Sequence, residues 1–166
     1  SVGSACARAA STDVGGSLKA GTSALIAGLN ASKEGAPTLV AAADKRMARV
    51  ASSAELNYGD GAAALLCGTE NVIAKLVGHH SVSMDFVDHF RASRAPFDYE
   101  WEGRWIREEG HEGIAVDAIR GALDKLARKA DSIAHFIAPI AASGVAARLA
   151  KATGIPASAV RDTLSR

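Results

Sequence analysis

Residues 13–25 constrain the fold of this chain more than any other stretch, because the local pattern changes twice within a few residues. Residues 13–14 have the pattern of the end of a buried strand. The pair Gly15-Gly16 then predicts a tight turn. Ser17 is a typical N-cap residue, whose hydroxyl can accept a hydrogen bond from the first free N–H groups of a helix.

A helix is expected from about Ser17 to Lys33, with Gly35 ending it in a left-handed cap. A side chain at such a helix start lies at the positive end of the helix dipole. A cysteine there would have a stabilised thiolate and would act as a nucleophile. The sequence has Leu18 at this position, which has no nucleophilic atom.

Composition limits the classes of function that fit the chain. Hydrophobic residues make up 48% and charged residues 22% of the 166, so a packed core is expected. The net charge of +1 gives no electrostatic case for binding nucleic acid or an anionic membrane. No apolar run is long enough to span a membrane, and no signal peptide is visible.

The cysteine and histidine residues predict neither a disulfide framework nor a metal site. Cys6 and Cys67 are the two cysteines, and they favour a reducing, cytoplasmic setting. No Cys-x-x-Cys pair is present, and His79-His80 has no obvious third ligand. Cys67 lies within an apolar stretch and is expected to be an inert core residue. For Cys6 the sequence does not decide between an inert and a reactive thiol.

Three strands are expected in the middle of the chain. Residues 38–43 are apolar throughout, as in a strand covered on both faces. A second apolar strand over 61–67 and a third over 72–77 are predicted to pair antiparallel through a turn at 68–71. The glycines of Gly59-Asp60-Gly61 either line a ligand site or only serve the turn, and the sequence does not decide between these.

The second half predicts helices and one further strand. Trp101 and Trp105 are four residues apart, which places them on one face of a helix, and we expect both to be largely buried. The remaining expectations are a short helix with an excursion over 79–99, an amphipathic helix over 114–129, a strand over 131–138, a helix over 143–153 ended by Gly154, and a short helix over 158–164.

Five blocks carry a resemblance to a known family. In chain order they are LKAGTSAL at 18–25, VAAADKR at 40–46, YGDGAAALL at 58–66, FVDHFR at 86–91 and WEGRWIREEG at 101–110. Together they resemble the thiolase superfamily, and most of all the hydroxymethylglutaryl-CoA-synthase-like thiolases that work with a small zinc-ribbon/OB-fold partner. In that group the first block begins with the nucleophilic cysteine, which Leu18 replaces here.

The resemblance implies a thiolase-like layered α/β fold that is partial. Residues 1–130 would be the remainder of the N-terminal thiolase-like unit, with a cap segment over 79–110 above the acyl-CoA entrance or, equally, a surface loop. Residues 131–166 would begin the C-terminal unit. Because family members are longer, we expect a fragment, a truncated chain or one piece of a split protein.

The resemblance also implies a set of site residues. An acyl-CoA pocket would involve Lys19, Gly59, Gly61 and Phe86, although a lysine beside a loop is more often only solvated. The family's catalytic histidine aligns with His135 in one register and with Phe136 in another. Only one of the two can face a pocket, because neighbouring residues alternate across a strand. A purely structural histidine is an equally good reading of His135.

The expected function is a thiolase-like subunit without its own cysteine nucleophile, which supports a partner that forms or cleaves C–C bonds on an acyl-CoA. One alternative is an active acyl-CoA acyltransferase with an altered nucleophile, and another is a structural fragment without a ligand. The expected ligand is a coenzyme A thioester. Expected partners are a second thiolase-like chain, of the same or another kind, and the zinc-ribbon/OB-fold protein, with no nucleic acid and no membrane.

Overall fold

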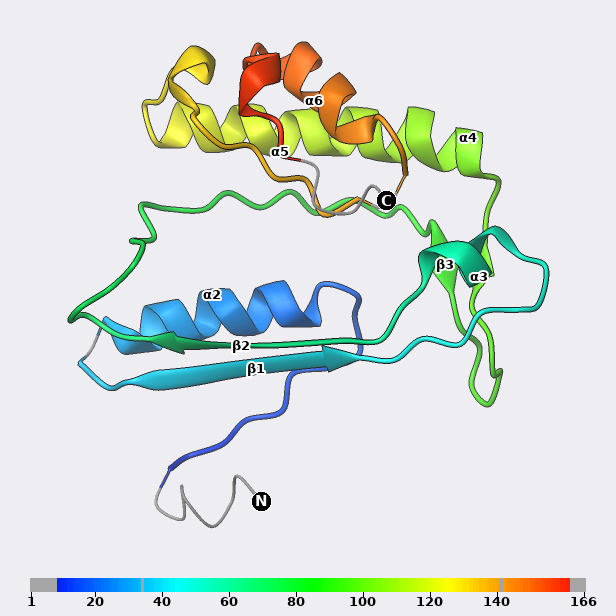
Figure 1. Cartoon of the computed structure of the whole chain (residues 1–166), viewed down its shortest axis with the longest axis horizontal. Coiled ribbons are helices and arrows are strands. Elements are labelled where there is room, and N and C mark those ends of the chain that lie inside the picture. Colours follow the sequence, from blue (N-terminus) through cyan, green and yellow to red (C-terminus); the bar gives the residue numbers. More distant parts are fainter. Residues whose placement is uncertain (1–8, 34, 141, 162–166) are drawn as a thin grey trace. The chain divides into compact units, whose positions relative to one another are not determined.

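A computed structural model describes residues 9–33, 35–140 and 142–161 (Figure 1). Helix accounts for 37% and strand for 13% of the chain, so the fold is mixed α/β. The chain divides into two compact units. The first unit comprises Ser1–Lys45 and Asp60–Lys75, and the second comprises Arg46–Gly59 and Leu76–Arg166. Each unit is described by itself.

A two-stranded antiparallel ribbon forms the sheet of the first unit. Strand β1, Thr38–Asp44, pairs along its whole length with β2, Gly61–Cys67. The two strands confirm the expected positions. The predicted pairing of 61–67 with 72–77 is wrong, since β2 pairs with β1 and no strand forms over 72–77. The long apolar β1 offers a full-length partner, whereas Ile73 is fully exposed.

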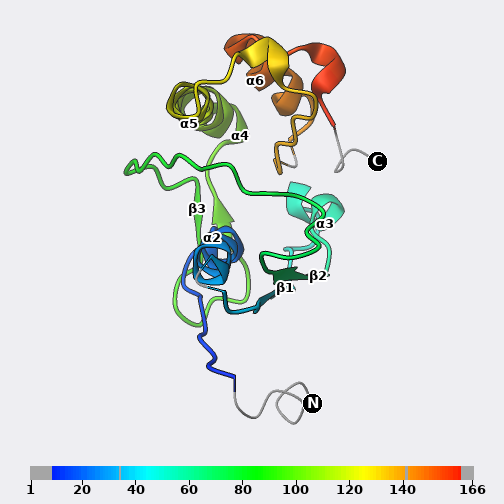
Figure 2. The ribbon, with the colours of Figure 1, turned by 90° about the vertical axis from the view of Figure 1, so that its left-hand side faces the viewer.

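One face of the ribbon is covered by helix α2, Ala20–Ser32 (Figure 2). Gly28 is buried at the contact, and a Cβ placed on it would collide with the side chain of Val40 and lie 3.4 Å from Cγ2 of Thr38. A Cβ on Gly21 would lie 3.7 Å from that of Ala42. Glycine at position 28 therefore allows the helix backbone to approach the strand closely.

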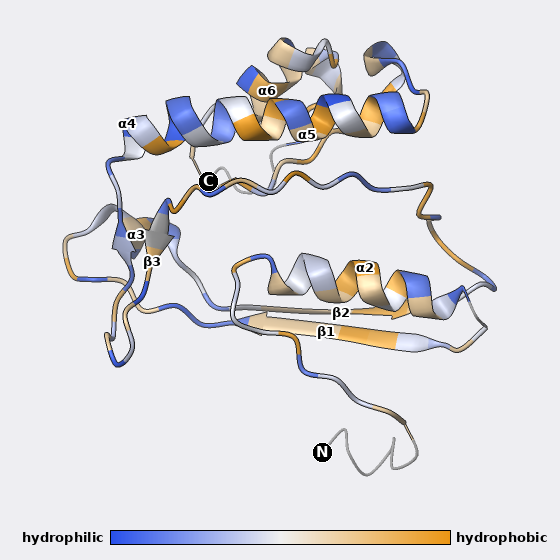
Figure 3. Ribbon diagram, turned by 180° about the vertical axis from the view of Figure 1, so that it is seen from behind, coloured by the Kyte–Doolittle hydropathy of each residue, from blue (hydrophilic) through white to orange (hydrophobic). Residues whose placement is uncertain are grey.

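The opposite face of the ribbon is apolar and exposed. Residues directly opposite each other in the register share a face, so this face is made by three pairs: Leu39 with Leu66, Ala41 with Ala64, and Ala43 with Ala62. Leu39 is 55% and Leu66 is 75% exposed. We call these six residues the bare sheet face. Figure 3 shows the hydrophobic colour along the strands of the ribbon. The expectation of a strand covered on both faces is therefore wrong within this chain.

The start of α2 differs from the prediction by three residues. The helix begins at Ala20, and the hydroxyl of Ser17 accepts from the backbone N–H of Lys19 at 3.3 Å. Residues 13–14 are not a strand but exposed extended chain, since no neighbouring strand in the described residues pairs with them. Gly35 has a φ of +91°, which confirms the left-handed residue after the helix.

Helices α5, Glu112–Lys125, and α6, Val145–Thr153, form the core of the second unit. Val116 from α5 packs with Val145 and Leu149 from α6, and Leu149 is only 2% exposed. The amphipathic pattern predicted over 114–129 is confirmed, with its charged residues exposed on the other face. Gly154 has a φ of +78° and ends α6 as predicted.

The other elements of the second unit are short. They are α3 (Ser53–Asn57), β3 (His89–Phe90) paired antiparallel with β4 (Tyr99–Glu100), α4 (Gly103–Trp105), a π-helix (Ile106–His111), and 3-10 turns at Ala130–Ser132 and Ala157–Ala159. The short helix expected within 79–99 is absent, because this stretch lacks a helical apolar period; it consists of irregular chain, the short strand β3 and a turn at 93–94. Where a helix over 158–164 was expected, the described residues form only the 3-10 turn at Ala157–Ala159. Residues 162–164 of that expected helix lie outside the described residues.

The strand predicted over 131–138 is also wrong. Its only ladder contact in the described chain is a parallel bridge from Phe136 to Val160, in which the N–H of Phe136 donates to the carbonyl of Ala159 at 2.8 Å. A strand needs a neighbour along its length, and the second unit supplies one residue of pairing. The expected boundary between residues 130 and 131 falls inside this unit.

Candidate functional site

Leu18 lies in the turn just before α2 and its side chain is 64% exposed. Lys19 follows as the N-terminal flanking residue of the helix and is also exposed. Position 18 is therefore accessible, and its side chain is an alkyl group. An alkyl side chain cannot form a thioester.

Gly59 and Gly61 have ordinary backbone angles. Neither has a positive φ, and a Cβ added to either would meet nothing within 4 Å. Gly61 begins β2 opposite Asp44. Neither the backbone angle φ nor a close neighbouring atom therefore requires glycine at these two positions. Leu18, Lys19 and Gly61 belong to the first unit, whereas Gly59, Phe86 and His135 belong to the second.

Phe86 belongs to a chain of five aromatic rings. It stacks on Trp105 with ring centroids 4.6 Å apart, and a Cβ on Gly110 would lie 2.8 Å from its Cζ. The series continues from Trp105 to Trp101 at 6.0 Å, then to Tyr99 and Phe90.

Both tryptophans are half-exposed, which makes the predicted burial wrong. Trp101 is 49% and Trp105 is 41% exposed. Trp101 precedes the helix, and its backbone N–H donates to the backbone carbonyl of Asp88 at 3.0 Å. The four-residue spacing therefore does not place the rings on one helical face.

Glu102 caps the helical stretch that begins at Gly103. Its carboxylate accepts the backbone N–H of Arg104 at 2.7 Å and that of Trp105 at 2.9 Å. These two hydrogen bonds hold the pKa of Glu102 below its ordinary value of 4.5.

We expect this cap to stabilise the fold above about pH 4.5 and to be lost as the pH falls through the lowered pKa, since protonation removes the acceptor charge. The loss of the cap should appear as an acid transition in the near-ultraviolet circular dichroism of the tryptophans, followed from neutral pH to about pH 3. Glu102→Gln should remove this acid transition. Glu109→Gln, an equal loss of charge at an exposed residue that caps nothing, should keep it. Equal effects would contradict the capping role.

Arg46 lies in a cluster with Asp98 and Tyr58. Its guanidinium forms an ion pair with Asp98, donating from Nε at 3.1 Å, and lies 4.1 Å from the centroid of the Tyr58 ring. Burial raises the pKa of Tyr58, and the nearby Arg46 opposes this. Arg46 is thus held by Asp98 and Tyr58.

His135 and Phe136 differ in exposure. His135 is exposed, whereas Phe136 is partly buried and lines a cavity of about 390 Å³ in the second unit. The wall is almost wholly apolar and comes from α5, from residues after it and from one residue well before it. It is lined by Val77, Ile119, Ala122, Leu123, Leu126, Arg128, Ser132, Ile133, Phe136 and Ile155. His135 is not part of this wall.

The polar edge of the cavity is fixed by the end of α5. The N–H of Ala127 donates to the carbonyl of Asp124 at 3.0 Å, and that of Arg128 donates to Leu123 at 2.9 Å. Ala127 has a φ of +48°, so these two bonds form a Schellman cap with alanine in the place usual for glycine. Ser132 donates its hydroxyl to the carbonyl of Lys129 at 2.7 Å.

The apolar stripe of α5 that forms one wall was visible in the sequence. The opposite wall was not, because it depends on a 3-10 turn and on the bridge at Phe136, which leave no local pattern.

Cys67 is a free, buried cysteine, as expected of a core residue, while Cys6 lies outside the described residues. Among the described residues, no three His, Cys, Asp or Glu side chains are grouped closely enough to hold a metal ion. Within the same residues, no helix is both long and apolar enough to cross a bilayer.

Comparison with models of known families finds no match for this chain, and comparison with curated proteins finds none.

Proposed function

We propose that this chain is a thiolase-like subunit that performs no acyl transfer of its own and supports a partner which forms or cleaves C–C bonds on an acyl-CoA. The observation that carries the proposal is Leu18 at the entry to α2. The turn and helix that would activate a thiol are present, whereas the side chain at that point is inert.

The resemblance supports the thiolase part of the proposal through five blocks in order along the chain. The first block spans the turn and first residues of α2, the second most of β1, and the third most of β2. A coenzyme A thioester as ligand, a second thiolase-like chain and a zinc-ribbon/OB-fold protein as partners belong to the same proposal.

The bare sheet face supports the assembly part. Helix α2 covers one face of the two-stranded ribbon. The six apolar side chains on the uncovered face favour burial against another chain. A supporting subunit needs such an interface, whereas a self-sufficient enzyme does not.

The substitution Leu18→Cys tests whether Leu18 occupies a vacated nucleophile position. We expect the variant thiol to have a lowered pKa, because the N-terminal end of α2 stabilises the thiolate. The pH dependence of alkylation by iodoacetamide, followed by peptide mass spectrometry, measures the pKa at each cysteine. Asn30→Cys is the matched control, since it places an exposed thiol in the last turn of the same helix.

If the Leu18→Cys thiol alkylates at neutral pH no faster than the Asn30→Cys thiol, Leu18 does not occupy a vacated nucleophile position. The wild-type chain, incubated with acetyl-CoA, should gain no acyl group. An adduct on Cys6 or Cys67 would favour the active-enzyme alternative instead.

A further inference from the structure

We infer that the apolar cavity of the second unit binds an unbranched aliphatic carboxylate, with the alkyl chain in the cavity and the carboxylate at Arg128. The cavity contains none of the residues expected to line an acyl-CoA pocket. It does contain Phe136, which was the alternative to His135 as the position of the catalytic histidine. The inference does not depend on the proposed function.

The size and lining of the cavity define the apolar part of the ligand. Its volume of about 390 Å³ lies within the range of small-molecule sites. At roughly 30 Å³ for each carbon-sized group and with incomplete filling, this space holds a chain of about eight to twelve carbons. Aliphatic side chains from α5 and from Ile133 and Ile155 make the wall, and these surfaces gain most from contact with methylene groups.

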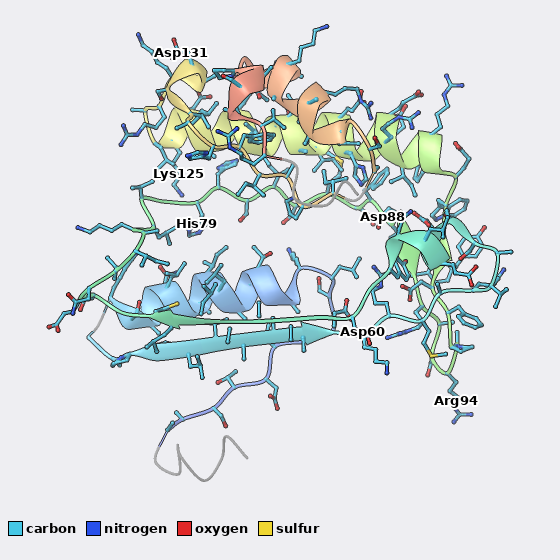
Figure 4. All side chains as sticks on the ribbon, in the orientation of Figure 1. Asp60, His79, Asp88, Arg94, Lys125 and Asp131 are labelled. Carbon is cyan, nitrogen blue, oxygen red and sulfur yellow. The ribbon has the colours of Figure 1, made fainter. Side chains whose placement is uncertain are left out.

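The charge at the edge defines the other end of the ligand. Arg128 is the charged residue of the wall, it is exposed, and it forms no ion pair with any carboxylate in the described residues. A guanidinium presents paired donors that match a carboxylate. Near Arg128 in the sequence, Lys125 and Lys129 add positive charge and Asp124 and Asp131 add negative charge. Figure 4 shows Lys125 and Asp131 on this part of the second unit.

The backbone at this edge opposes an anion less than an uncapped helix end would. Carbonyl groups at a helix C-terminus normally repel negative charge. Here the Schellman cap occupies the carbonyls of Leu123 and Asp124 with two N–H groups. The same cap fixes the backbone of Arg128 beside the apolar wall. The hydroxyl of Ser132 donates to the backbone carbonyl of Lys129, so Arg128 is the donor that the wall offers to a carboxylate.

Isothermal titration calorimetry with decanoate, kept below its micelle concentration, tests the inference on the full chain. Decan-1-ol, with the same alkyl length and no charge, serves as the ligand control. Arg128→Gln removes the proposed anchor. Lys129→Gln removes the same charge one residue away, at a position that does not line the cavity. Ala122→Phe fills the cavity from α5, and the circular dichroism spectrum of each variant checks that it folds.

Decanoate should bind wild type at least about tenfold more tightly than decan-1-ol, and Arg128→Gln should abolish that preference, as expected for loss of one charge-assisted contact. Lys129→Gln should change decanoate affinity by less than about twofold. Ala122→Phe should remove binding of both ligands.

Three results would overturn the inference. They are an absence of binding to wild type, equal weakening by the two charge variants, and decanoate binding that persists in folded Ala122→Phe. The last result would place the ligand elsewhere, for example on the bare sheet face.

Discussion

Leu149→Ala is expected to lower the free energy of unfolding of the second unit by about 2–5 kcal/mol. Leu149 is 2% exposed and packs between Val116 of α5 and Val145 of α6. Removing its side chain loses buried apolar surface and leaves a cavity at the contact between the two helices. Urea denaturation followed by tryptophan fluorescence measures the effect, because both tryptophans lie in this unit.

Leu56→Ala is the matched control for this prediction. It makes the same chemical change on α3, where the side chain is 88% exposed. It should change the free energy of unfolding by less than about 0.5 kcal/mol. Similar losses in the two variants would contradict the position of the core between α5 and α6.

Leu66→Glu is expected to dissociate the assembly that we propose for this chain. Leu66 lies on the bare sheet face opposite Leu39, and a stable interface of about 1,600 Å² in total would bury both. A carboxylate placed in such an interface without a partner group weakens association strongly, by at least about a hundredfold. Analytical ultracentrifugation across a series of protein concentrations measures the shift.

Ile73→Glu separates this effect from a general effect of charge. Ile73 belongs to the same unit, is fully exposed and does not lie on the bare sheet face. Its substitution should leave the association constant unchanged. Association that survives Leu66→Glu, or that is lost equally in Ile73→Glu, would show that the interface lies elsewhere.

The elements that the sequence predicted well are those whose signals are local. Helix α5 has a long amphipathic stripe, α6 ends at a glycine with positive φ, and β2 is an uninterrupted apolar run. In each case the period or the terminal residue is contained in the segment itself.

The elements that failed depend on a neighbour that the sequence does not identify. Residues 72–77 have strand composition, but β1 takes the place beside β2. Residues 131–138 find a single bridge at Phe136, and their first two residues belong to a 3-10 turn, so no strand forms. The tryptophan pair failed for a different reason, because the helix begins after Trp101 and continues as a π-helix beyond Trp105.

The candidate sites divide in the same way. The inert residue at the start of α2 could be found from the sequence, since the turn and helix around Leu18 are local features. The cavity beside Phe136 could not, because its walls are brought together by α5, a 3-10 turn and the segment at Val77, which are far apart along the chain.

The native mass of the purified chain at micromolar concentration tests most directly the claim that it works as a supporting subunit. The account predicts that the 17.0 kDa chain is recovered in a species of at least about twice its own mass, either with a second copy or with another chain. A single 17.0 kDa species across the concentration series, with no associated chain, would contradict it.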